Sequence, residues 1–286
     1  MPNFDLANIR ALTGQVKKTF DGLKAPKQAY EDIATVVKTK SHTVNYAWLS
    51  TVPSMKEWLG ARDEKSLADR TYHIVKRDWE ATISVMRDDF LFDNLGIVKP
   101  KVQQLHHSVV KHYNSMVHAL ITDNGVCFDG QPFFGEHDVA GTTYDNSGTS
   151  PLSEDALFAV IGMMSAIKDE QSEVLGIEPN RLLISPNLLK TAKTILGSKV
   201  IGGSDNIAHN LLELQVIPSM ADDSWCVLDT SQPLKPFILQ ITKDGKVEED
   251  TSKMFSEKRV IYGVDTMDSA GYGFWQMAFF SDGTGA

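Results

Sequence analysis

The sequence contains no segment that could span a membrane and few residues that could form covalent cross-links. No stretch approaches the roughly 18 consecutive apolar residues that a bilayer crossing requires. The opening MPNFDLANIR carries an early acid where a signal peptide has a basic end and an apolar run. The two cysteines, Cys127 and Cys226, lie far apart without CxxC partners, which argues against a zinc knuckle or a disulfide framework. We therefore expect a soluble protein, made in the cytoplasm, with two buried free thiols and no membrane contact.

Concentrated positive charge and the common catalytic motifs are also missing. The chain has 28 basic and 37 acidic residues, a formal net charge of −9, and its basic residues occur singly or in pairs such as Lys17 and Lys18. A dedicated nucleic-acid binder normally gathers Lys and Arg into a strip that neutralises phosphates. The sequence has no GxSxG, no GxxxxGK[ST] and no GxGxxG after a strand. An acidic protein of this kind could still surround DNA without binding it tightly. No motif identifies the chain as an enzyme.

The sequence does contain an N-terminal arm followed by an aromatic β segment. Residues 5–23 place apolar side chains at helical spacing, which predicts an amphipathic helix that packs on its own chain or on a neighbour. Residues 44–87 hold β-branched and aromatic residues in rough alternation, which predicts strands. An isolated two-stranded ribbon is only marginally stable in water. We therefore expect Trp48, Trp58 and Trp79 to lie against this chain's core or against an adjacent subunit.

The rest of the chain alternates helices and short strands. Apolar residues at every third or fourth position predict a long helix over about 98–122. Ser153 suits the N-cap of a second helix, and Pro186 and Gly197 suit the start and end of a third. Short apolar runs predict further strands at 181–185, 213–219, 224–229 and 236–242, with closing strands from 258 to 283.

Four histidines on the predicted long helix are the first candidates for metal chemistry: His106, His107, His112 and His118. No two are four positions apart, the spacing that helical metal sites use. His107 and His118 share a helix face with Lys111 and Asn114, which we expect to be a solvated or interfacial surface.

The stretch DGQPFFGEHD, residues 129–138, is the second candidate. Consecutive polar residues in a loop rarely point at one atom, whereas Asp129 and Asp138 suit turns in which a carboxylate accepts from backbone amides. We therefore predict a structural loop anchored by its two phenylalanines, and no catalytic, cofactor-binding or metal-binding residue. The alternative is a metal-dependent hydrolase that uses His137 with Glu136 or Asp138.

Several motifs resemble the major head subunit of Mu-like phages and prophages. The most specific part is 44–134, which holds YAWLSTVPSMKEWLG, SVMRDDFLFDNLGI and DGQPFF in that order. NIRALTGQVKKTF near the start and LGIEPNRLLISPNL in the middle support it, so the resemblance covers nearly the whole chain. It implies an α+β capsid protein of the Hong Kong 97 type.

The same resemblance implies a division of the chain. An N-terminal arm is expected at 1–43 and an extended β-hairpin loop at 44–87. A peripheral domain is expected at 88–149 and 240–286, built on the long helix as its spine, and an axial domain at 150–239.

The function that the resemblance implies is structural and not enzymatic. Subunits would assemble into hexamers and pentamers of an icosahedral head that encloses double-stranded DNA without sequence-specific binding. The expected partners are other copies of the chain, a separate scaffold protein and a portal. The expected location is the virion capsid, after assembly in the cytoplasm of a bacterial host. An encapsulin-like compartment that stores a cargo enzyme is an alternative with the same fold.

Subunit contacts in such a shell would use apolar anchors, together with arginines that pair with carboxylates of the neighbour. The residues we predict at these contacts are Trp48, Trp58, Trp79, Arg62, Arg77 and Arg87.

Overall fold

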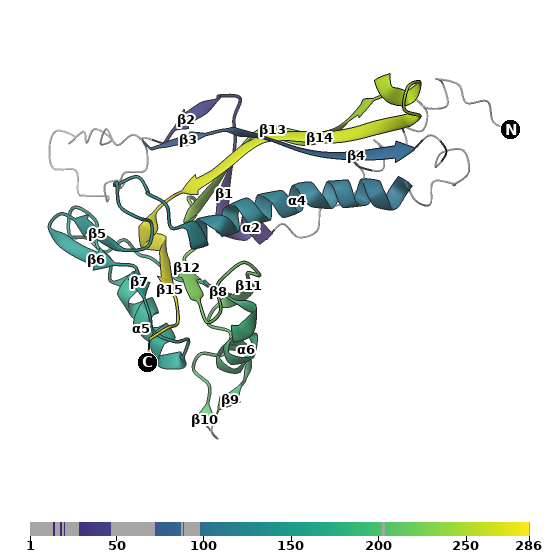
Figure 1. Ribbon diagram of the computed structural model, residues 1–286. Coiled ribbons are helices and arrows are strands. Elements are labelled where there is room, and N and C mark those ends of the chain that lie inside the picture. Colours follow the sequence, from purple (N-terminus) through teal and green to yellow (C-terminus); the bar gives the residue numbers. More distant parts are fainter. Residues whose placement is uncertain are drawn as a thin grey trace, which may run out of the picture.

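The computed structural model describes residues 29–46, 72–86, 98–201 and 204–285, together with Gly14, Lys18, Phe20 and Asp88. Figure 1 shows an elongated layer of strands and one long helix, which we call the blade, standing on a more compact part, which we call the body. Within the described residues, no helix combines the length and hydrophobicity that a membrane crossing needs.

The blade is a four-stranded sheet in the order β1–β13–β14–β4. Its strands are β1 (Ala34–Lys38), β13 (Phe237–Asp250), β14 (Arg259–Tyr272) and β4 (Arg77–Met86). β14 pairs antiparallel with both of its neighbours, whereas β1 pairs parallel with β13. The β13–β14 hairpin, which contains the short helix η2 (Ser252–Met254), ends at the tip of the blade farthest from the body (Figure 1). The small antiparallel ribbon of β2 (Thr43–Asn45) and β3 (His73–Val75) lies at the other end.

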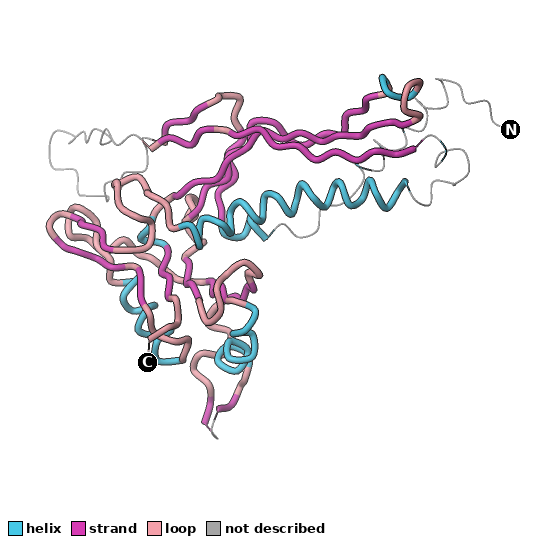
Figure 2. Tube along the Cα trace, viewed as in Figure 1, coloured by secondary structure: helices cyan, strands magenta, loops and turns pink. Residues whose placement is uncertain are grey.

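Helix α4 (Val98–Asp123), the long helix of the blade, runs along one face of this four-stranded sheet (Figure 2). It agrees with the helix predicted at about 98–122, because its apolar stripe is long enough to read from sequence alone. Alternate residues of β14 are buried from Val260 to Asp268, and Leu105 of α4 belongs to the same apolar cluster as Val260 and Tyr262. The helix therefore covers the face of the sheet that this alternation makes apolar.

Gly14, Lys18 and Phe20, the described residues of the helix predicted at 5–23, are helical. Phe20 is buried in the cluster beneath the blade, and its ring meets that of His106 edge-on at 4.9 Å. At this residue the arm packs on its own chain. The short helix α2 (Ala29–Ile33) then leads into β1, and its Tyr30 packs edge-on against Tyr113 of α4, with ring centroids 5.6 Å apart.

The body is built on a five-stranded sheet in the order β11–β8–β12–β15–β7. Its strands are β11 (Glu213–Val216), β8 (Arg181–Ile184), β12 (Trp225–Leu228), β15 (Ala278–Ser281) and β7 (Ser147–Gly148). The helices of the body are α5 (Glu154–Ser165), η1 (Pro186–Leu188), α6 (Leu189–Gly197) and η3 (Trp275–Met277). It also has two small antiparallel ribbons. One pairs β5 (Glu136–Val139) with β6 (Thr142–Asp145), and the other pairs β9 (Val200–Ile201) with β10 (Ser204–Asp205).

The helix starts and ends that the sequence predicts in the body are confirmed. The Ser153 hydroxyl accepts from the Ala156 amide at the start of α5. Pro186 opens η1, and α6 ends at Gly197. One continuous core joins body and blade, because residues of β8 and β12 belong to the same apolar cluster as Val117 and Ile121 of α4.

The sheet pairings cross the boundaries of the expected division at two points. All of β4, from the β segment expected at 44–87, pairs with β14 as the edge strand of the blade. The boundary expected at 240 falls inside β13, and the C-terminal strand β15, from the part expected to be peripheral, pairs with β12 of the body. Both pairings join residues that are distant in sequence, which local periodicity does not reveal.

Candidate functional site

The loop that follows α4 folds around a hydrogen-bonded cluster of Cys127, Asp129 and His137. Asp129 Oδ2 lies 2.6 Å from His137 Nδ1, and the Cys127 thiol donates to Asp129 Oδ1 across 2.9 Å. The Gln131 amide donates to the same Oδ1 atom. Gly130 has a φ of 87°, a left-handed value that suits glycine. The turn predicted from the sequence is therefore present, and Asp129 accepts from a backbone amide as expected.

His137 is almost completely buried and is held from two further directions. Its Nε2 atom lies 3.2 Å from the backbone oxygen of Phe133. The imidazole stacks on Trp275 with centroids 4.0 Å apart and planes 5° from parallel. Phe133 and Phe134 are buried as well, which confirms that the two phenylalanines anchor the loop.

The environment of the cluster fixes its charge. Partial burial alone would raise the pKa of the Asp129 carboxyl, but hydrogen bonds from His137, Cys127 and the Gln131 amide outweigh burial and hold that pKa at about 2. Burial raises the pKa of the Cys127 thiol, and the neighbouring Asp129 raises it further. Asp129 is therefore ionised and Cys127 is a neutral thiol. The two ring nitrogens of His137 face two oxygen atoms, Asp129 Oδ2 and the Phe133 carbonyl oxygen.

The hydrolase alternative required His137 to act with Glu136 or Asp138, and the structure does not bring these side chains together. All three residues lie on β5, where only His137 faces inward and Glu136 and Asp138 are exposed. Successive side chains of a strand point to opposite faces. Asp138 instead accepts from the Gly141 amide in the β5–β6 turn, the structural role that the sequence predicted for it.

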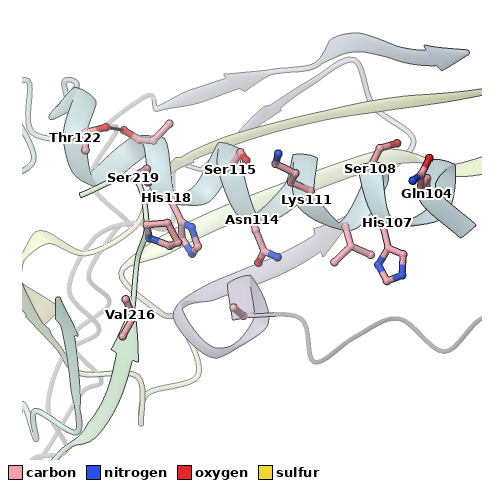
Figure 3. A pocket seen from close by; sticks show the side chains of 14 residues that line it. Gln104, His107, Ser108, Lys111, Asn114, Ser115, His118, Thr122, Val216 and Ser219 are labelled. Carbon is pink, nitrogen blue, oxygen red and sulfur yellow. Dashed lines mark hydrogen bonds between the residues drawn. The ribbon is translucent and has the colours of Figure 1, made fainter. Parts of the chain in front are cut away.

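A groove of about 870 Å³ runs along the face of α4 that carries His107, Lys111, Asn114 and His118 (Figure 3). Val216, the last residue of β11, lines the side of the groove that the body forms, together with Pro218 and Ser219. His118 is 8% exposed, and burial lowers its pKa to about 4, so that its ring is neutral at neutral pH. The predicted polar face therefore lines a concave junction between blade and body.

Of the six residues predicted at subunit contacts, Arg77 and Trp79 are described, whereas Trp48, Trp58, Arg62 and Arg87 lie outside the described residues. Both described residues are on the edge strand β4. Trp79 is 39% exposed, and its ring centroid lies 4.7 Å from that of His112. Arg77 is exposed and makes no ion pair with another described residue. Neither side chain is buried in the core of its own chain.

Two features escaped the sequence analysis. His112 Nε2 lies 2.9 Å from Oδ1 of the fully buried Asp268. The two residues are 156 positions apart, so no local pattern could have paired them. At the tip of the blade, Phe255 is 99% exposed. The sequence alone does not distinguish an exposed phenylalanine in a polar turn from one that is buried and anchors the turn.

Comparison with known proteins places the chain among phage head subunits. The family profile described as "Mu-like prophage major head subunit gpT" matches residues 9–151, 144–220 and 216–284. The Mu-like prophage FluMu major head subunit of Haemophilus influenzae is 30% identical over 278 residues, which cover 94% of this chain and 71% of that protein. The major capsid protein of Escherichia phage Mu is 25% identical over 279 residues, covering 95% and 72%.

The fold leads to the same group. A chain of the bacteriophage JBD30 procapsid superimposes with a TM-score of 0.61 at 25% identity, covering 97% of this chain and 76% of that chain. The mixed α/β fold is therefore that of Hong Kong 97-type capsid proteins. The family profile and both of these relatives are phage head or capsid subunits. This chain belongs to the family of the Mu-like prophage major head subunit gpT, and it is a structural component of a phage head, not an enzyme.

Proposed function

We propose that copies of this chain assemble into hexamers and pentamers that form an icosahedral head around double-stranded DNA. Head-to-tail contacts that close into rings generate such capsomers. The relative from bacteriophage JBD30 is itself described as part of a procapsid, an assembled shell. The formal net charge of −9 suits a wall that surrounds DNA without binding a particular sequence.

The observation that carries this proposal is the incomplete burial of the blade. Strand β4 has one buried residue out of ten, and large side chains such as Trp79 and Phe255 remain exposed along the blade. Burying one such side chain against a neighbour contributes about 1.5–3 kcal/mol. Many weak contacts of this size, made at once, hold a subunit firmly in a closed shell.

We assign the parts of the fold to this assembly as follows. The blade with α4 serves as the peripheral domain and its spine helix, and the body serves as the axial domain that surrounds the capsomer centre. Residues 1–43 form the arm, which contributes β1 to the blade. The extended loop of 44–87 contributes β4 to the blade and reaches an adjacent subunit. The pairing of β15 with β12 supports including the C-terminal strand in the axial domain.

The proposed contacts keep the six residues predicted from sequence. Trp48, Trp58 and Trp79 act as apolar anchors, and Arg62, Arg77 and Arg87 pair with carboxylates across the boundary. For the described pair, support comes from the exposed Arg77 side chain and from β4, whose outer edge pairs with no other described strand. Curvature comes from a separate scaffold protein, and DNA enters through a portal, before the finished shell leaves the host cytoplasm as part of the virion.

Electron microscopy of Trp79→Ala, co-expressed with the scaffold protein, tests the proposal. Because Trp79 is part-exposed on an edge strand, the variant should fold as the wild type does and yield fewer closed shells. Trp79→Phe keeps an aromatic anchor and should restore most of the yield. Wild-type yield and shell stability in Trp79→Ala would contradict the contact role. Wild-type protein that stays monomeric with its scaffold would contradict the shell itself.

A further inference from the structure

We propose that Cys127, Asp129 and His137 form a binding site for a divalent transition-metal ion, with zinc as the cation that suits the three ligands best. The shell function does not require this site, so the inference goes beyond the proposed function. Its basis is the convergence of three different ligand types, two from the turn after α4 and one from strand β5.

The three ligand atoms already lie close enough to share an ion. The Cys127 sulfur, an Asp129 oxygen and the His137 Nδ1 atom lie within 4.8 Å of one another. Zinc bonds of about 2.0–2.3 Å in a tetrahedral arrangement separate ligand atoms by roughly 3.5 Å. The present contacts of 2.9 Å and 2.6 Å along the cluster would therefore open by about 1 Å or less.

The surroundings of His137 match those of a metal-binding histidine. Such a residue usually donates its second ring N–H to a carbonyl or carboxylate, which fixes the tautomer and the ring orientation. Here His137 Nε2 faces the Phe133 carbonyl oxygen at 3.2 Å, which leaves Nδ1 for the ion. The stacked Trp275 ring fixes the imidazole plane before any ion arrives. Asp129 is held in a similar way by the Gln131 amide.

The ligand types select the ion. A thiolate and an imidazole favour zinc and its neighbours over calcium or magnesium, which prefer oxygen ligands alone. The Asp129 side chain is 11% exposed, whereas that of His137 is fully buried. The ion would therefore enter from the Asp129 side, where water or the second carboxylate oxygen supplies the fourth ligand. An occupied site would tie the turn after α4 to strand β5.

Cobalt(II) is the probe for the first experiment, because a cobalt–thiolate bond gives a near-ultraviolet charge-transfer band that oxygen and nitrogen ligands do not give. Titration of the full-length wild-type protein, freed of metal by a chelator, should give this band at one equivalent. Zinc added in one equivalent should abolish the band and raise the midpoint of thermal unfolding.

The variants separate this site from nonspecific binding. Cys127→Ser should lose the band, and Asp129→Asn should weaken cobalt binding at least tenfold. Cys226→Ser removes the other buried thiol, which within the described residues belongs to no such ligand group, and should keep the band. A wild-type protein that shows no band and no zinc-dependent shift would overturn the proposal, as would a band lost in Cys226→Ser. Shell formation by a protein that binds no metal would leave the proposed function intact.

Discussion

The body and the blade bury their strands to very different extents. In the body, all of β12 and three of the four residues of β8 are buried. In the blade, β13 shows the change within one strand, because its first five residues are buried, whereas of the remainder only Val247 is. The body thus completes its own core. The blade, toward its tip, leaves most of its described residues exposed or only partly buried.

The largest effect expected from this difference is on the stability of the isolated subunit. Trp225 is fully buried on β12, and its indole N–H donates to the Ser150 carbonyl oxygen across 2.9 Å. Trp225→Ala should lower the free energy of unfolding by about 3–5 kcal/mol, through the cavity and the lost indole hydrogen bond; the Ser150 oxygen keeps its second donor, the Ser281 hydroxyl. Urea denaturation of unassembled subunits measures this loss.

Trp79→Ala in the blade is the matched control for Trp225→Ala. The two changes remove the same atoms, but Trp79 is 39% exposed, so its loss should cost the isolated subunit about 1 kcal/mol or less. Equal losses in the two variants would show that the blade is as self-sufficient as the body, and the distinction drawn from burial would fail.

The same difference explains what could be predicted from sequence. Helix α4 was found because its stripe repeats over 26 residues, and β8 and β12 were found because short apolar runs mark strands buried on both faces. The placement of β4 was not predictable, because its partner β14 lies far along the chain. The sequence of β4 alone does not show which strand it pairs with. Sheet order therefore had to come from the structure.

The candidate site follows a related rule. The Asp129 turn was read from local chemistry, and the burial of both phenylalanines followed from their type. The pairing of His137 with Asp129 is not predictable from proximity in sequence, which favours the adjacent Glu136 and Asp138. On a strand those neighbours face away, whereas Asp129, eight positions earlier, returns to it through the turn.

The next effect concerns the junction of blade and body, and it depends on pH. The pKa of His118 falls from about 6.5 in the unfolded chain to about 4 in the folded protein, because burial penalises the charged ring. The unfolded state then binds more protons between these values. His118 therefore contributes stability that is complete above about pH 6.5 and is lost as pH falls toward 4. Its expected size is of the order of 3 kcal/mol.

Stability curves measured from pH 7.5 to 4.0 test this assignment. His118→Leu should flatten the acid side of the curve, because its side chain cannot take up a proton. His107→Leu, on the same face of α4 but exposed, should leave the shape of the curve unchanged. If both variants kept the wild-type slope, the acid sensitivity would have to come from other groups.

The smallest expected effect on subunit stability is at the tip of the blade, where Phe255 is 99% exposed. Phe255→Ser should change the free energy of unfolding by less than about 0.5 kcal/mol, because the folded subunit buries none of the ring. In the shell, however, the same ring would lie against a neighbour, so the yield of closed particles should fall while Phe255→Trp retains it. Light scattering during scaffold-assisted assembly would measure this. Unchanged assembly of Phe255→Ser would mean that the tip stays in solvent in the finished head, and that the neighbour covers the blade along β4 instead.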